Sequence, residues 1–105
     1  MTNEQKKEYL AKYRLQQAKI RRLCELIEEN PEKKAEYDIE INKARAFRDR
    51  IEAFVEAVDG GILTEILFQK YLCGKSLEEI SYNLHYSQRQ TERLHIKALE
   101  GFSFA

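Results

Sequence analysis

Six polar residues near the carboxyl end of the chain are of the types that proteins use to bind DNA. Arginine binds the edge of guanine, glutamine binds the edge of adenine, and arginine or lysine binds phosphate. A serine at the start of a helix offers phosphate a hydroxyl and a backbone N–H. At helical spacing these side chains share an outward face, away from the apolar positions. The predicted DNA-contacting residues are Ser87, Gln88, Arg89, Glu92, Arg93 and Lys97.

Two short helices joined by a tight turn must position this face. In the first helix, Leu77, Ile80 and Leu84 have the spacing of one buried side. Ser76 and Glu79 form a capping box, in which each side chain satisfies a backbone N–H that the first turn leaves unpaired. The sequence therefore predicts a helix that begins directly after Ser76.

The second helix of the pair is predicted over residues 87–99. Ser87 and Gln90 repeat the capping-box pattern and fix where this helix begins. The small Ser81 in the preceding helix lets the two helices cross closely. Helices joined in this way are typical of a helix-turn-helix, whose second helix enters the major groove of DNA. The predicted inward residues are Thr91, Leu94, Ala98 and Leu99.

Three segments of this half of the chain resemble region four of bacterial sigma factors. They are residues 69–80 (QKYLCGKSLEEI), 86–87 (YS) and 97–99 (KAL). That family shows a RY-x-x-G-x-SLEEIA run, a G-[VY]-S turn and a KAL close. More specifically, the chain is similar to small phage and prophage regulators that carry such a unit behind a helical segment. The resemblance implies a DNA-binding unit and RNA polymerase as a partner. It also implies a positive φ at His85, where the family usually has glycine.

The amino-terminal half is predicted to form two long helices, over residues 2–29 and 31–58. Asn30 and Pro31 separate them, since asparagine is a good N-cap and proline fits the first helical position. So short a break predicts an antiparallel hairpin over residues 1–59. A hairpin of charged helices buries little surface, so it should pack on the rest of the chain or on a second copy. The seam expected along the first helix is Leu10, Tyr13, Gln17, Ile20, Cys24 and Ile27.

A third helix is predicted over residues 62–72, and it is apolar on nearly all sides. Such a helix is buried from more than one direction, so we expect it to join the hairpin to the helix-turn-helix. No stretch alternates apolar and polar residues as a strand does. The predicted fold class is therefore all-α, with a long helical hairpin followed by a three-helix unit over residues 60–105.

Residues 9–24 contain five basic residues and no acidic one. They offer either a second stripe of phosphate contacts or a face that pairs with the acidic start of the second helix. We expect the pairing across the hairpin, because charge runs on helices usually belong to such faces. The basic residues are Lys12, Arg14, Lys19, Arg21 and Arg22.

The chain has 18 basic and 18 acidic residues, which argues against a nonspecific binder of polyanions. Cys24 and Cys73 are far apart and lack metal-ligand spacing, so we expect two reduced, mostly buried thiols. His85 and His95 have no third ligand nearby, and no metal or cofactor is predicted. No glycine-rich phosphate loop or activated nucleophile indicates an enzyme.

The chain has no apolar run near the roughly 18 residues that a membrane span needs. Its polar start, MTNEQKKEYL, does not resemble a signal peptide. These features predict a cytoplasmic protein without membrane contact.

The sequence thus predicts a sequence-specific DNA-binding transcriptional regulator of phage or prophage type, with helix 87–99 in the major groove of double-stranded DNA. RNA polymerase and a second copy of the chain are left open as further partners. The alternative is a protein–protein adaptor with a sigma-like fold and little affinity for DNA, which would bind RNA polymerase or another transcription complex. Glu92 and the zero net charge favour that alternative.

Overall fold

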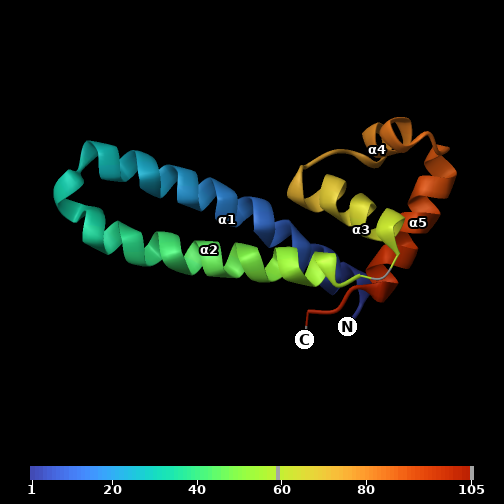
Figure 1. The fold of residues 1–105 in the computed structure, drawn as a ribbon, viewed down its shortest axis with the longest axis horizontal. Helices are drawn as coiled ribbons and strands as arrows, with labels where there is room; N and C mark the ends of the chain where they lie inside the picture. Colours follow the sequence, from blue (N-terminus) through green and yellow to red (C-terminus); the bar gives the residue numbers. More distant parts are fainter. Residues whose placement is uncertain (59, 105) are drawn as a thin grey trace.

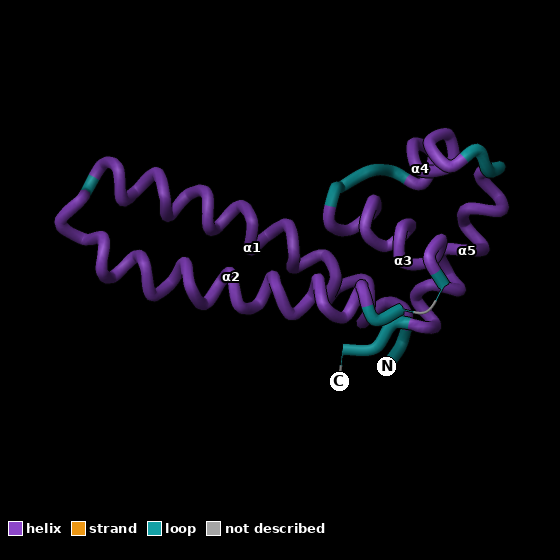
Figure 2. Tube along the Cα trace, viewed as in Figure 1, coloured by secondary structure: helices purple, strands orange, loops and turns teal. Residues whose placement is uncertain are grey.

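The structure is a computed structural model that describes residues 1–58 and 60–104. Over this part of the chain, helices are joined by short loops and no strand occurs (Figure 2). The predicted all-α class is therefore confirmed. The α-helices are α1 (Asn3–Glu29), α2 (Lys34–Glu56), α3 (Gly61–Leu67), α4 (Leu77–Leu84) and α5 (Gln88–Gly101), with a 3₁₀ turn at Pro31–Lys33 and a π-helical segment at Phe68–Leu72.

Helices α1 and α2 run side by side in opposite directions and form the predicted hairpin (Figure 1). Thr2 caps α1 through a complete capping box, with Thr2 Oγ1 3.2 Å from Gln5 N and Gln5 Oε1 2.9 Å from Thr2 N. Asn30 stands at the predicted N-cap position with Pro31 as the first helical residue, but its side chain forms no cap hydrogen bond. Its side chain donates to Leu26 O at 3.4 Å at the end of α1, and a 3₁₀ turn from Pro31 precedes α2.

Two separate clusters of buried side chains hold the hairpin. The larger lies at its base, where α1 and α2 meet α3, the π-helical segment and α5. The smaller lies toward the tip and contains only residues of α1 and α2. The buried residues of the base are Leu10, Tyr13, Ile51, Val55, Val58, Leu67, Tyr71, Ala98, Leu99 and Phe102. Those of the tip are Ile20, Leu23, Ile41 and Ala44.

The predicted seam of α1 is correct only in part. Gln17 and Cys24 are exposed, and Leu23 is buried instead. The expectation of mostly buried thiols is also wrong, because Cys24 and Cys73 are both exposed.

The expected pairing of the basic run with α2 occurs at a single residue. Lys19 Nζ lies 3.5 Å from Glu40 Oε2 across the hairpin. In the described parts of the chain, no salt bridge involves the other four basic residues of the run. The reason is register: most of this run points away from α2, into solvent. The residues that remain without a carboxylate are Lys12, Arg14, Arg21 and Arg22.

The third predicted helix has the expected central position. Ile66 and Leu67 of α3 are fully buried. Helix α3 packs on α5 and α2, and the π-helical segment that follows packs on α1 and α4. The last turn widens, with Cys73 N donating to Phe68 O at 3.0 Å, an arrangement that is rare outside functional or strained sites. The predicted boundary between the two domains falls at residue 59, outside the described residues.

Candidate nucleic-acid interface

Helix α4 begins as its capping box predicts. Ser76 Oγ accepts from Glu79 N at 3.1 Å, and Glu79 Oε1 accepts from Ser76 N at 3.3 Å. Ile80 is fully buried, while Leu77 and Leu84 are half-buried beside it. The box and this apolar side fix both the start of α4 and its rotation.

The turn between α4 and α5 is tight because one residue adopts a left-handed conformation. His85 has φ 61°, so the positive φ predicted for this position is confirmed. Tyr86 N then donates to Ser81 O at 3.0 Å and closes the turn. Ser81 is buried, so the two helices approach closely there.

Helix α5 starts at Gln88 and runs to Gly101, two residues beyond its predicted end. Ser87 Oγ accepts from Gln90 N at 3.1 Å. The reciprocal bond from the Gln90 side chain is missing among the described contacts, so the second capping box is only half formed. The exposed Gln90 amide is solvated instead, since water competes for it.

One side of α5 is buried at three of its four predicted positions, with one addition, while the fourth, Leu94, is only half-buried. Thr91, Ala98 and Leu99 have no exposed surface. The Thr91 hydroxyl donates to Ser87 O at 2.9 Å, so its burial leaves no unpaired polar atom. Sequence reasoning missed His95, which is only 5 % exposed and lies on this inward side.

The opposite side of α5 faces solvent. Arg89, Arg93 and Lys97 are spaced four residues apart and form one stripe, beside which Glu92 also lies exposed. No salt bridge neutralises the three cations within residues 1–58 and 60–104. The predicted outward orientation is confirmed, while contact with DNA stays a prediction. The exposed candidate residues are Ser87, Gln88, Arg89, Glu92, Arg93 and Lys97.

A lysine from the first turns of α1 holds the end of α5. Lys6 is 8 % exposed, and its Nζ donates to Leu99 O at 2.6 Å and to Glu100 O at 3.3 Å. These carbonyls belong to the last turn of the helix, where the dipole favours a cation, and Leu99 O also accepts from Phe102 N at 3.1 Å. The contact therefore fixes the carboxyl end of α5 to the hairpin.

A buried hydrogen bond holds the middle of α5. Tyr71 Oη lies 2.8 Å from His95 Nε2. Burial lowers the pKa of His95 to about 4, and the charges of Lys70 and Lys7 act in the same direction. Burial also raises the pKa of Tyr71 to about 12, with a contribution from the charge of Glu4. At neutral pH both groups are uncharged, so the bond carries no unpaired buried charge.

The aromatic tail, residues 102–104, packs on the base of the hairpin. Phe102 is 1 % exposed, and Phe104 stacks on Tyr9 with ring centroids 4.0 Å apart and planes 6° from parallel. Phe47 and Phe54 of α2 also approach Tyr9. The chain that leaves α5 is thus tied to α1 through Tyr9, which also contacts the aromatic rings of α2.

The exposed face of α5 is therefore held on the rest of the chain by the contacts of Lys6, Tyr71 and the residues that follow the helix. It lies at the end of the molecule away from the hairpin tip (Figure 1). In the described chain, no group of three or more metal-binding side chains gathers, and none of its helices is long and apolar enough to cross a membrane. No protein-family model, curated protein or solved structure matches this sequence.

Proposed function

We propose that this protein is a sequence-specific DNA-binding transcriptional regulator of phage or prophage type, in which α4, the turn and α5 act as a helix-turn-helix. One observation carries the proposal. Helix α5 buries Thr91, His95, Ala98 and Leu99 on one side, and its other side presents Arg89, Arg93 and Lys97 without carboxylate partners among the described residues. A cationic helix held in this way suits the major groove of DNA.

The position of each side chain along α5 suggests its role. Gln88 and Arg89 stand at the start of the helix, which in this mode of docking lies deepest against the base edges. Arg93 is one turn further on and reaches either a base or a phosphate. Lys97 is nearest the far end and contacts phosphate. Glu92 accepts a hydrogen bond from cytosine or repels unsuitable bases, so it contributes specificity rather than affinity.

The zero net charge predicts that one copy binds weakly. Two copies on a palindromic site would bind more tightly, because the second contact becomes intramolecular. We therefore expect a repeated half-site in the preferred DNA sequence.

The decisive experiment selects preferred sites from a pool of random duplexes and then measures binding at several salt concentrations. Arg89→Ala with Arg93→Ala is compared with Arg45→Ala with Arg50→Ala, a matched pair of exposed arginines on α2. We expect the α5 variant to lose affinity and sequence preference, while the α2 variant keeps both. The proposal is wrong if the wild-type protein selects no sequence and does not bind duplex DNA at low salt.

A protein–protein adaptor is the second candidate, and an exposed aromatic residue favours it. Tyr82 on α4 is 83 % exposed, in a shallow hollow that it shares with Glu78, Glu79 and Asn83. Exposed tyrosines are frequent anchors of protein interfaces, and the two carboxylates suit a basic partner. RNA polymerase is the partner to test, with Tyr82→Ala against Leu15→Ala, an exposed apolar residue on α1. Loss of polymerase binding in the Tyr82 variant alone would favour the adaptor.

A further inference from the structure

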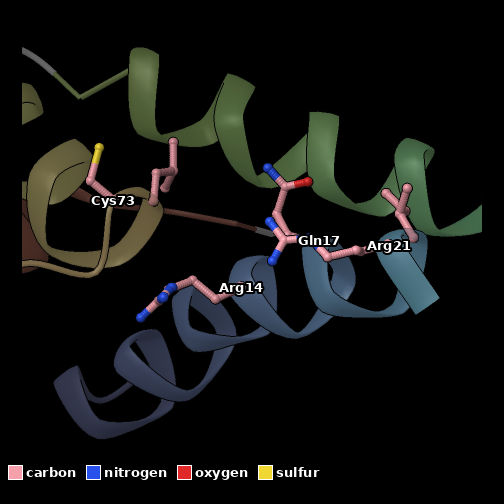
Figure 3. Close-up of a pocket in the computed structure, with 6 residues that line it drawn as sticks. Arg14, Gln17, Arg21 and Cys73 are labelled. Carbon is pink, nitrogen blue, oxygen red and sulfur yellow. The ribbon is translucent and has the colours of Figure 1, made fainter. Parts of the chain in front are cut away.

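A groove lies where the hairpin meets the π-helical segment, and arginines form one of its walls. It encloses about 380 Å³. Figure 3 shows Arg14, Gln17 and Arg21 along α1, with Cys73 across from them. The lining residues are Arg14, Gln17, Ile20, Arg21, Leu72 and Cys73.

The six residues that line this groove include two arginines and no acidic residue. Neither Arg14 nor Arg21 forms a salt bridge within residues 1–58 and 60–104. The Gln17 carbonyl is already engaged, since it accepts from Arg48 Nη1 at 3.1 Å. No acidic residue occurs between positions 9 and 24 of α1. Because like charges with no counterion attract anions, the groove favours an anionic ligand.

The guanidinium group of Arg14 is held against the loop that leads into α4. A Cβ atom at Gly74 would collide with Arg14 Nη1, and Gly74 has φ +76°, which side chains rarely adopt. Glycine at this position therefore serves the left-handed turn, and the flexible arginine side chain lies close beside it. Arg14 thus lies beside the loop that leads to Ser76, the N-cap of α4.

We propose that this groove binds the phosphodiester backbone of the same DNA whose major groove α5 enters. The inference rests on the proposed function. In such docking the first helix of the pair crosses the sugar–phosphate backbone, and α4 begins at Leu77, directly after the loop that touches Arg14. Arg14 and Arg21 are about 10 Å apart along α1, so they reach separate phosphates. The hairpin thereby extends the DNA interface beyond the α4–α5 unit.

Two carboxylates stand near this corner, at the start of α4. Glu79 is engaged by the cap, because its Oε1 lies 3.3 Å from Ser76 N and 3.2 Å from Ser76 Oγ. Glu78 is exposed on α4, in the hollow with Tyr82. The DNA backbone therefore passes on the α1 side of the loop, where the guanidinium groups lie.

The test compares Arg14→Ala with Arg21→Ala against the control pair Arg45→Ala with Arg50→Ala, on the full chain. Binding is measured across salt concentrations on the selected duplex and on a scrambled duplex. We expect the groove variant to lose about tenfold in affinity on both duplexes, and its salt slope to be shallower by about two, since two phosphate contacts are removed. On a duplex trimmed to the α5 site, the variant and the wild type should bind alike, because the flanking phosphates are gone.

The outcomes separate this inference from the proposal on which it rests. If wild-type protein binds the selected duplex and the groove variant shows the same affinity and salt slope, the groove inference is wrong and the DNA-binding proposal stands. A loss confined to the selected duplex would also overturn it, since phosphate contacts carry no sequence preference. If the wild type does not bind DNA, both are wrong. Far-ultraviolet circular dichroism and the melting temperature show that each variant is folded.

Discussion

The two ends of the hairpin belong to the same two helices and are packed very differently. At the base, α1 and α2 are covered by α3, the π-helical segment, α5 and the aromatic tail, and ten buried residues form one core. At the tip the same two helices have only each other, and four buried residues join them. Both ends are rich in charged residues on their outer faces.

This difference shows what the hairpin depends on. Isolated helices gain most of their stability from packing, and a two-helix end with a small core gains little. The tip is therefore held by its continuity with the base. The base also supports α5, since Lys6, Tyr71 and Phe102 all belong to it or contact it. Stability and the presentation of α5 thus come from one region.

The largest expected effect tests this contrast with the same substitution at two sites of α2. Ile51 has no exposed surface in the base, and Ile41 is 4 % exposed in the tip. We expect Ile51→Ala to lower the free energy of unfolding by about 4 kcal/mol and Ile41→Ala by about 2 kcal/mol, because the looser tip collapses around the cavity. Urea denaturation followed by circular dichroism measures both. Equal losses would show that the tip is packed as tightly as the base.

Much of this architecture could be predicted because its causes are local. The α4 capping box, the left-handed His85 and the inward side of α5 depend on residues within one or two turns of each other. Lys6 gave no such signal, since it is one lysine among many and its acceptors lie 93 and 94 residues away. Burial of His95 depends on Tyr71 in the same way. The predicted seam of α1 was wrong near Cys24, because packing on α2, and not residue spacing alone, decides which residues of α1 are buried there.

The second largest expected effect is a loss of folding stability at low pH, and it arises at His95, which bonds to Tyr71 in the core at the base of the hairpin. His95 has a pKa of about 4 in the folded chain, below its ordinary value of 6.5. Between those values the unfolded chain binds the extra proton, so stability is complete above pH 6.5 and falls as the pH approaches 4. The loss amounts to about 3 kcal/mol from this group. Unfolding free energies from urea titrations at several pH values measure it.

The control for this prediction removes the titrating ring. His95→Gln should be less stable at neutral pH but lose less stability between pH 6.5 and 4 than the wild type. His85→Asn, which removes the exposed histidine at the left-handed turn, is the matched control variant. Parallel profiles for the wild type and His95→Gln would mean that burial of His95 does not disfavour its charged form.

The third largest loss of stability is expected when the Lys6 contact is removed. Lys6→Met keeps the length of the buried stem and removes the ammonium group that bonds Leu99 O and Glu100 O. Hydrogen bonds to charged groups contribute about 1.5–3 kcal/mol, so we expect a loss near 2 kcal/mol. Amide hydrogen exchange should quicken over residues 98–102, where the end of α5 is released. Lys7→Met, at a half-buried neighbour paired with Glu4, should change exchange there very little. Unchanged exchange in the Lys6 variant would show that the tail alone holds α5.

The smallest effects compare a cap in the carboxyl-terminal unit with a cap at the tip. Ser87 Oγ accepts from Gln90 N at 3.1 Å at the start of α5, whereas Asn30 donates to Leu26 O at 3.4 Å beside the hairpin turn. We expect Ser87→Ala to lower the free energy of unfolding by about 1 kcal/mol and Asn30→Ala by less than half of that.

The reason is geometric: the serine bond is shorter and satisfies a helix N–H that has no other partner, whereas Leu26 O also accepts from Asn30 N at 2.8 Å. Ser76→Ala serves as a reference, because the capping box of Ser76 is complete. Its loss of unfolding free energy should be the greatest of the three. If Asn30→Ala costs as much as Ser87→Ala, the hairpin turn stabilises the tip independently of the base.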